Sequence, residues 1–274
     1  MQSTEVRDAT QSQADVVQGI AAEKVPGHWL LASLGKRVLR PGGLDLTMRL
    51  LERLGIGQMD DVLELAPGLG VTAQMVLKRQ PHSYTAVERD EEAARRITGL
   101  LDGFRNRCVL GTAESTGLPS DAFSVAYSEA MLTMQSTQAK MRILREARRL
   151  LQRGGKYGVH ELCIVPDDAG ERVRRELERR LSLNIHVGVQ PLSAAEWRHL
   201  FECAGFRVLW EGRAPVHLLE PRRLVRDEGL VGTLRFAFNV LRRPDARKRV
   251  VSMRRLFREY RKNLEAVAFV CVKE

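Results

Sequence analysis

Short apolar runs alternate with amphipathic segments through the middle of the chain. The runs are rich in Val, Leu, Ala and Tyr, and we interpret them as strands of a buried sheet, at residues 61–66, 83–90, 107–114, 122–130 and 156–165. Segments with apolar side chains at helical spacing separate them, near 72–80, 91–101 and 139–155. Strands that alternate with helices predict a parallel sheet with helices on both of its faces.

Additional helices are predicted on both sides of this pattern. Residues 26–57 contain two helical patterns, which Arg40-Pro41-Gly42-Gly43 interrupts. After the fifth strand the chain continues with two predicted helices, at 167–183 and 193–205. The two final strands are predicted at 206–212 and 266–274. The stretch between those last two strands is far longer than a hairpin, and we interpret it as an inserted helical subdomain.

These patterns predict a Rossmann-like α/β chain with four regions. We expect a mobile polar tail at 1–24 and an N-terminal helical lid at 25–58. The core would comprise 59–212 and 265–274, and a basic helical insertion at 213–264 would precede the last strand. The core would hold a seven-stranded, mostly parallel sheet. A chain of 274 residues is long enough to bury an ample core in this arrangement.

The charge of the chain is concentrated in one segment. The formal net charge is +10, and 15 Lys/Arg against 5 Asp/Glu fall between Arg213 and Lys262, so the remaining chain is neutral with 29 of each sign. Three interpretations stay open. The segment is an amphipathic cover over the active site with solvated arginines, a surface for an anionic small substrate, or a surface for lipid headgroups or nucleic acid.

Several classes of protein are disfavoured by composition. The four cysteines are scattered without C-x-x-C spacing, which indicates small buried side chains and argues against a metal site or a disulfide framework. No apolar run approaches the length of a membrane span, and the N-terminal residues lack the basic start and apolar centre of a signal peptide. These features predict a cytoplasmic protein.

A glycine-rich turn follows the first strand. Pro67-Gly68-Leu69-Gly70 ends the run at 61–66, and Thr72 is a candidate cap for the helix that follows. Glycines let a ligand approach the backbone closely, and a helix start offers unpaired N–H groups. In open α/β sheets, ligands bind in the crevice beyond the carboxyl ends of the strands. The stretch therefore predicts a loop that binds a nucleotide-type ligand.

An acid stands at the end of the second strand. Glu88 follows Gly70 by 18 residues, and its carboxylate offers paired acceptors for the two ribose hydroxyls of an adenosine. After the third strand, "GTAESTGLP" (111–119) places small and acidic residues where an adenine edge could be read.

In this order the motifs resemble the class I S-adenosylmethionine-dependent methyltransferases, in particular the small-molecule branch around the quinone and sterol enzymes. The resemblance covers about residues 60–165, and "LREARRLLQRGG" (144–155) with the strand after it is its most diagnostic part. It implies an enzyme that uses S-adenosylmethionine, releases S-adenosylhomocysteine and needs no metal. Two residues depart from the family pattern. Ala66 replaces a glycine, which indicates that the turn need not take a positive φ there, and Thr112 replaces an aspartate that accepts from the adenine amino group.

The resemblance also implies roles for individual residues. Glu64 would order the loop and the amino-acid end of the cofactor, Glu88 would hold the ribose, and Ser128 would lie beneath the sulfonium. The implied cofactor-binding residues are Glu64, Ala66, Gly68, Gly70, Glu88, Arg89, Thr112, Ala113, Glu114 and Ser128.

Catalytic candidates follow the fourth and fifth strands. His160 could accept a proton from a nucleophile, although a strand-end histidine bonded to backbone is the alternative, and Glu129 and Tyr127 are comparable candidates. Methyl transfer needs little acid–base help when the nucleophile is held in line.

We expect a small-molecule acceptor, with an anionic one as a variant, that is methylated on O, N, S or C. One alternative is a non-catalytic cofactor-binding or interaction protein. The other is an enzyme directed to RNA or lipid through the basic insertion. "YSEA" (127–130), where methyltransferases of bases and amides favour N-P-P-Y/F, argues against targets of that kind.

Overall fold

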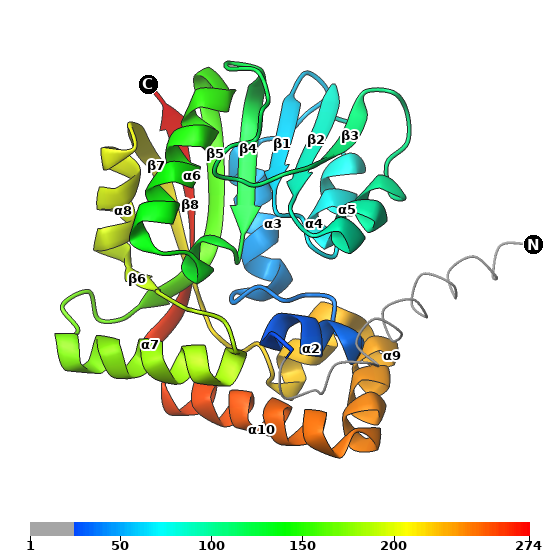
Figure 1. Ribbon diagram of the computed structural model, residues 1–274, viewed down its shortest axis with the longest axis vertical. Coiled ribbons are helices and arrows are strands. Elements are labelled where there is room, and N and C mark those ends of the chain that lie inside the picture. The colour runs from blue at the N-terminus through cyan, green and yellow to red at the C-terminus, as the bar shows by residue number, and fades with distance from the viewer. Residues whose placement is uncertain (1–24) are drawn as a thin grey trace, which may run out of the picture.

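A twisted, mostly parallel sheet forms the centre of the molecule in the computed structural model, which describes residues 25–274 (Figure 1). Its strands are β1 (Asp61–Leu65), β2 (Ser83–Glu88), β3 (Asn106–Leu110), β4 (Phe123–Glu129), β5 (Leu151–Ile164), β6 (Leu192–Ser193), β7 (Phe206–Pro215) and β8 (Leu264–Lys273). Seven of them run in the order β3-β2-β1-β4-β5-β8-β7. β8 is antiparallel to both of its neighbours, and the other pairs are parallel.

The predicted path of seven strands is confirmed, and β6 adds an eighth. This two-residue strand pairs with the end of β5, where Cys163 lies opposite Leu192. One boundary differs from the prediction. The helix expected at 139–155 ends at Leu150, and β5 begins directly at Leu151, which pairs with Phe123 of β4. The register then shifts across Gly154 and Gly155, so these glycines form an irregularity inside the strand rather than a helix end.

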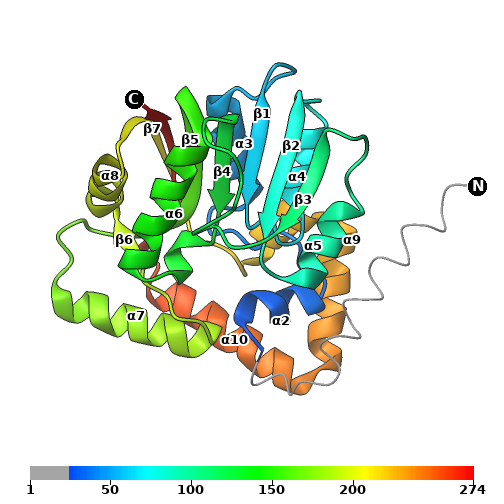
Figure 2. The ribbon, with the colours of Figure 1, turned by 45° about the horizontal axis from the view of Figure 1, so that its top comes forward.

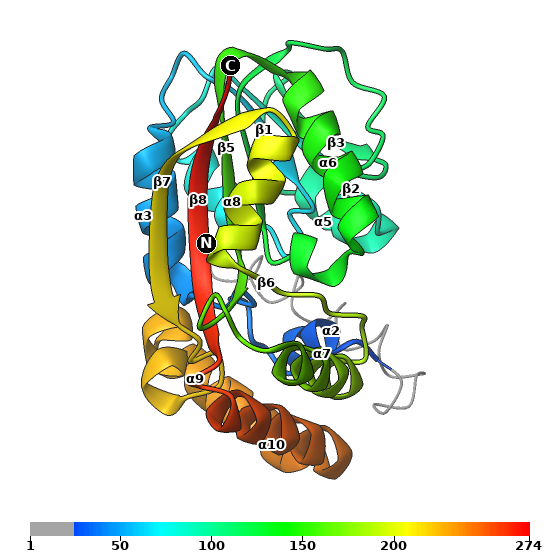
Figure 3. The ribbon, with the colours of Figure 1, turned by 90° about the vertical axis from the view of Figure 1, so that its left-hand side faces the viewer.

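Helices cover both faces of the sheet. They are α2 (Gly27–Ser33), α3 (Gly43–Leu54), α4 (Val71–Leu77), α5 (Glu91–Thr98), α6 (Thr137–Leu150), α7 (Glu171–Ile185), α8 (Ala194–Cys203), α9 (Pro221–Arg242) and α10 (Pro244–Glu259), with a 3-10 turn at Leu132–Met134. α3, α4 and α5 bury apolar side chains against one face, and α6 and α8 against the other (Figure 3). Helices on both faces, as predicted, leave a parallel sheet buried on each side.

The remaining helices lie beyond the carboxyl ends of the parallel strands. α2, α7 and α10 gather there, with α9 beside α2 (Figures 1 and 2). Two helices, α2 and α3, lie within the region expected as a lid. α3 contacts β5, β7 and β8 and therefore covers the sheet. α2 and the segment after it face the strand ends. The tail expected at 1–24 lies outside the described residues. No helix within residues 25–274 is long and apolar enough to cross a bilayer.

Candidate active site

A cavity of about 370 Å³ separates the strand ends from the helices beyond them. The loops after β1, β2, β3 and β4 form one wall, through residues 66–69, 88–90, 111–114 and 129–135. The facing wall comes from α2, α7, α10 and the segment after β7 (Figure 2). The cavity therefore occupies the crevice in which open α/β sheets bind their ligands.

The glycine turn after β1 borders this cavity with an unusual backbone. We expected that an alanine at this position need not take a positive φ, but Ala66 does take one, at φ +58°. Its N–H donates to Val87 O at 2.9 Å, which ties the turn to β2 and holds alanine in a conformation that favours glycine. Gly68 has φ +54°, and a Cβ there would meet no atom within 4 Å. The turn thus presents open backbone to the cavity.

Gly70 and Thr72 contact other residues of the protein and do not line the cavity. Gly70, at φ +72°, is the N-cap residue of α4, and a Cβ on it would lie 2.7 Å from Leu100 and 2.8 Å from Ile97. Gly70 therefore permits close packing between the turn and α5, and it is not among the residues that line the cavity. The sequence suggested Thr72 as the cap of α4, but the structure shows no such cap. The Thr72 hydroxyl donates instead to Glu129 of β4.

Glu88 is buried at the end of β2 and holds the turn in place. Its Oε2 accepts from the Gly68 N–H at 3.1 Å, and its Oε1 accepts from the Arg89 and Asp90 N–H groups at 2.9 and 3.1 Å. A carboxylate has about four acceptor positions, so one remains for a ligand hydroxyl. Arg89 and Asp90 line the cavity beside it.

The loop after β3 completes this wall. Thr112, Ala113 and Glu114 all line the cavity, in agreement with the residues expected there. A short bridge between Thr112 and Ser115 shapes the loop. The Glu114 carboxylate accepts from Arg142 Nε at 2.5 Å, so part of its hydrogen-bonding capacity is already used.

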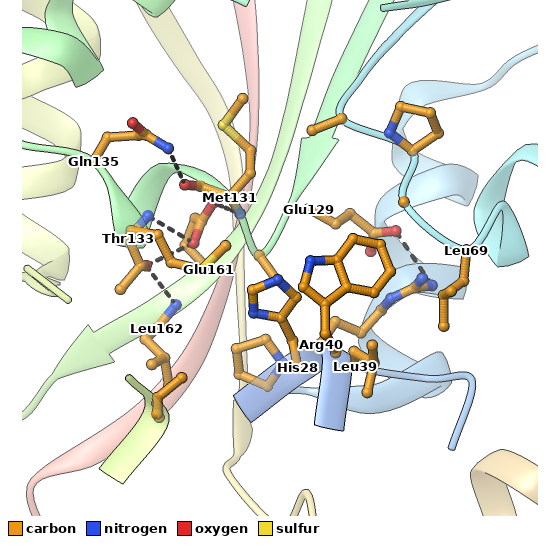
Figure 4. A pocket seen from close by; sticks show the side chains of 18 of the residues that line it. His28, Leu39, Arg40, Leu69, Glu129, Met131, Thr133, Gln135, Glu161 and Leu162 are labelled. Atoms are coloured by element: carbon orange, nitrogen blue, oxygen red, sulfur yellow. Dashed lines mark hydrogen bonds and ion pairs between the residues drawn. The ribbon is translucent and has the colours of Figure 1, made fainter. Parts of the chain in front are cut away.

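Glu129 is the centre of a polar cluster on the cavity wall (Figure 4). Its Oε1 accepts from Thr47 Oγ1 at 2.5 Å and from His160 Nδ1 at 2.9 Å. Its Oε2 accepts from Thr72 Oγ1 at 2.5 Å and lies 3.3 Å from Arg40 Nη1. Burial raises the pKa of this carboxyl, but the Arg40 guanidinium and the His160 hydrogen bond outweigh it and lower the pKa to about 2. Glu129 is therefore a fixed negative charge and a poor general base near neutral pH.

His160 supports this cluster and lies outside the cavity lining. Its ring is fully buried, and its Nε2 accepts from the Gly42 N–H at 3.0 Å. Because Nε2 is an acceptor, the proton resides on Nδ1, which donates to Glu129. Both ring nitrogens are engaged, so the structural alternative describes this histidine better than the catalytic one. His160 joins the Gly42 turn to Glu129.

Tyr127 and Glu64 form a second buried group behind the wall. The Tyr127 hydroxyl donates to Glu64 Oε2 at 2.6 Å, and the Tyr84 hydroxyl donates to the same oxygen. Burial raises the pKa of Glu64 to about 7 against these two hydrogen bonds. Neither Glu64 nor Tyr127 lines the cavity, so we no longer propose Tyr127 as catalytic or Glu64 as a direct ligand group.

Ser128 faces the other side of the sheet. Its hydroxyl lies 2.8 Å from the Tyr157 hydroxyl within the core shared with α6 and α8. Consecutive residues of a strand point to opposite faces, which places Ser128 away from Glu64 and Tyr127. The residue at the strand end, Glu129, reaches the cavity in its place.

Three further polar residues, Glu161, Arg40 and His28, line the cavity. Glu161 accepts from the Met131, Leu132 and Thr133 N–H groups at 2.6–3.1 Å and from the Thr133 hydroxyl, and so shapes the loop after β4 (Figure 4). Arg40 lines the cavity beside Glu129. His28 also lines the cavity, and its buried Nδ1 has no hydrogen-bond partner within residues 25–274.

The sheet order, the glycine turn and the acid at the end of the next strand define a Rossmann-like fold with a nucleotide-type crevice. Residues 62–155 match a family model described as a methyltransferase domain. A Haemophilus influenzae protein described as uncharacterized is 29% identical over 250 residues, which cover 90% of this chain and 96% of that protein.

Two solved structures share the fold. The MccD protein has a TM-score of 0.68 at 16% identity, over 87% of this chain and 100% of that one. Phosphoethanolamine N-methyltransferase 2 of Haemonchus contortus, solved with phosphomonomethylethanolamine and S-adenosylhomocysteine, has a TM-score of 0.69 at 14% identity, over 95% of this chain and 60% of that one.

Residues 62–155 are therefore similar to a methyltransferase domain, and the solved structures share its fold, which supports an enzyme with S-adenosylmethionine as its cofactor.

The cavity wall suits this cofactor. The Gly68 backbone is open, Glu88 keeps a free acceptor position, and Thr112, Ala113 and Glu114 border the same space. Within residues 25–274, no group of three or more His, Cys, Asp or Glu is arranged to hold a metal ion.

Proposed function

We propose that the enzyme methylates a small, largely apolar molecule that carries one hydrogen-bonding group. The observation that supports this most directly is the composition of the wall facing the strand ends. Its side chains are mainly apolar and come from α2, α7, α10 and the segments that follow α2, α7 and β7, namely Trp29, Leu31, Leu39, Ile185, Val189, Val216, Leu218, Met253 and Phe257. An enclosed apolar wall favours an apolar ligand, with orientation left to a few polar groups.

The basic insertion contributes no cation to this wall. Within residues 213–264, the cavity-lining residues are Val216, Leu218, Met253 and Phe257, all of them apolar. Arg40 borders the cavity but is paired with Glu129, and Arg37 lies 3.8 Å from Glu228. Arg89 also lines the cavity, but it follows β2 and so belongs to the strand-end wall. An anionic acceptor would need an uncompensated cation in its own part of the cavity. The lining therefore favours a neutral acceptor over the anionic variant.

The strand-end wall would hold the cofactor. Glu88 would accept from one ribose hydroxyl, Gly68 would allow close approach, and the 112–114 loop would border the adenine. S-adenosylmethionine, when bound, supplies a methyl group on a positively charged sulfur, which a nucleophilic atom of the acceptor displaces in line to give S-adenosylhomocysteine. Glu129 also lies on this wall, where its ion pair with Arg40 balances its charge and the pair adds a polar group to the wall.

His28 is the candidate for positioning the acceptor. Burial and the nearby Arg89 lower the pKa of its imidazole to about 4, so the ring is neutral above about pH 5. A neutral imidazole whose buried Nδ1 has no hydrogen-bond partner among residues 25–274 can exchange one hydrogen bond with the polar group of an acceptor. Strong acid–base catalysis is not required, because a positioned nucleophile supplies much of the acceleration.

The test is a methylation assay with matched acceptors. Purified enzyme with S-adenosylmethionine is offered neutral alkylphenols or quinols, their carboxylated analogues and RNA, and S-adenosylhomocysteine release is measured. We expect turnover with the neutral acceptors, and a fall in kcat/KM of about tenfold or more in Leu218→Gln, with S-adenosylhomocysteine affinity unchanged. Leu218→Met conserves the volume and is the control.

His28→Phe tests the hydrogen bond. It should lower kcat/KM by about tenfold to a hundredfold without weakening cofactor binding. Turnover confined to the carboxylated analogues or to RNA would refute the proposal. So would a Leu218→Gln enzyme that keeps full kcat/KM for the neutral acceptors.

A further inference from the structure

The outer half of α9 exposes an apolar face. Leu230, Val231, Leu234, Phe238 and Leu241, which we call the α9 stripe, are each between 54% and 72% exposed. They recur at helical spacing, on the side of the helix opposite the buried Phe236. Isolated exposed apolar residues are ordinary, but five on one face of one helix mark an interaction surface.

Cations flank the α9 stripe. Arg235 and Arg242 are exposed on the same helix, and the Arg242 guanidinium lies 4.9 Å from the centre of the Phe238 ring. Arg247 and Lys248 are exposed at the start of α10, next to the corner where the two helices meet (Figure 1). The sequence from Gly229 to Arg243 contains no Asp or Glu.

One acid of the insertion lies among these cations, since Asp245 Oδ1 is 3.8 Å from Lys248 Nζ and both side chains are exposed. The other acids are engaged elsewhere. Asp227 and Glu228 are buried, and Glu228 accepts from the Arg37 and Val38 N–H groups at 3.0 and 2.9 Å. Glu220 pairs with Arg254, and Glu259 pairs with Arg180. The four cations beside the α9 stripe therefore outnumber the one acid among them, which leaves the stripe in a net positive field.

From these observations we propose that the α9 stripe docks the enzyme on an anionic lipid bilayer. A helix with apolar side chains on its outer face and arginines beside them matches the pattern of helices that lie in the membrane interface, with the apolar face in the acyl region and the cations at the headgroups. A symmetric contact with a second copy would bring the same arginines against each other. Charge complementarity thus favours the bilayer over self-association.

Docking in this orientation would place the acceptor side of the enzyme near the membrane. Asn239 Nδ2, on the inner side of α9, donates to Leu34 O directly after α2, and α2 contributes Trp29 and Leu31 to the cavity. α10 continues from the same corner to Met253 and Phe257 in the cavity wall. The docking itself does not depend on which acceptor the enzyme uses.

The test is co-sedimentation of the full chain with vesicles of phosphatidylcholine alone and of phosphatidylcholine mixed with phosphatidylglycerol. We expect binding to the anionic vesicles, weakened by salt, and little binding to the neutral ones. Leu234→Ser with Phe238→Ser should lower partitioning by about tenfold or more, and Arg235→Gln with Arg242→Gln by about 30-fold, since each basic residue near the surface contributes roughly fivefold. Leu183→Ser, at an exposed leucine of α7, is the matched control and should bind normally.

Folding and assembly are checked in the same samples. All four substituted positions are exposed, and S-adenosylhomocysteine affinity should stay at the wild-type value, which separates this proposal from the proposed function. Equal binding to both vesicle types, or undiminished binding by both double variants, would overturn it. So would a dimeric wild type that the stripe substitutions convert to a monomer in sedimentation equilibrium.

Discussion

Replacement of Glu129 by glutamine tests the polar cluster that links α3, α4, β4 and β5 at the cavity wall. Glutamine is nearly isosteric with the protonated acid, so the pKa shift of the carboxyl estimates the cost of the change. The pKa is about 2 in the folded protein and 4.5 in an unperturbed glutamate. At 1.36 kcal/mol per pH unit, the ionised carboxylate contributes on the order of 3 kcal/mol at pH 7. Glu129→Gln also leaves the buried Arg40 without its countercharge.

The pH dependence has a definite sign. Because folding lowers this pKa, the stabilisation is complete above about pH 4.5 and is lost as the pH falls toward 2. We expect Glu129→Gln to lower the free energy of unfolding by about 3 kcal/mol at pH 7 and by only about 2 kcal/mol at pH 3.5.

Urea unfolding followed by circular dichroism at both pH values measures this difference. Glu114→Gln is the control, since its carboxylate pairs with an exposed Arg142 and should cost less than about 1 kcal/mol. Equal losses in the two variants, or a Glu129→Gln deficit that does not shrink at low pH, would refute the reasoning.

Three further substitutions probe the rest of the wall. Glu88→Ala removes the acceptor of three N–H groups and the proposed ribose partner, so calorimetry should show S-adenosylhomocysteine affinity lowered by about a hundredfold, and an unchanged affinity would remove Glu88 from the site. Ala66→Gly relieves a positive φ, so the free energy of unfolding should stay level or rise by up to about 1 kcal/mol, and a clear fall in urea unfolding would contradict the strained turn. Glu64 has its pKa raised by burial to about 7, so its own contribution to stability should decline by about 3 kcal/mol between pH 4.5 and 7, and the stability of Glu64→Gln relative to the wild type should rise by that amount; a difference between the two proteins that does not change with pH would count against it.

Local patterns were sufficient for the framework of the fold. The period-two and helical repeats predicted the strands and most helices because each element depends on which of its own faces is buried. The turn at Gly68 and the acid at Glu88 were also identified, since strand ends in a parallel sheet meet at one edge. The end of α6 was misplaced because Gly154 and Gly155 resemble a helix stop, whereas pairing with β4 extends the strand through them.

Side-chain roles near the site were harder to predict. His160, Tyr127 and Ser128 all lie close to strand ends, but their partners are Gly42, Glu64 and Tyr157, which come from other parts of the chain. Only the three-dimensional arrangement shows that these groups are already satisfied and that Glu129 alone among the catalytic candidates borders the cavity.

The sequence by itself determined the order of elements, the nucleotide-type turn and the position of the positive charge, because these depend on neighbouring residues and on composition. The tertiary structure alone decided the backbone of Ala66, the partners of the buried acids and the two faces of the insertion. On that insertion Met253 and Phe257 turn toward the cavity, whereas the α9 stripe and its arginines face outward. Those outcomes depend on packing between segments far apart in the chain, which no local pattern encodes.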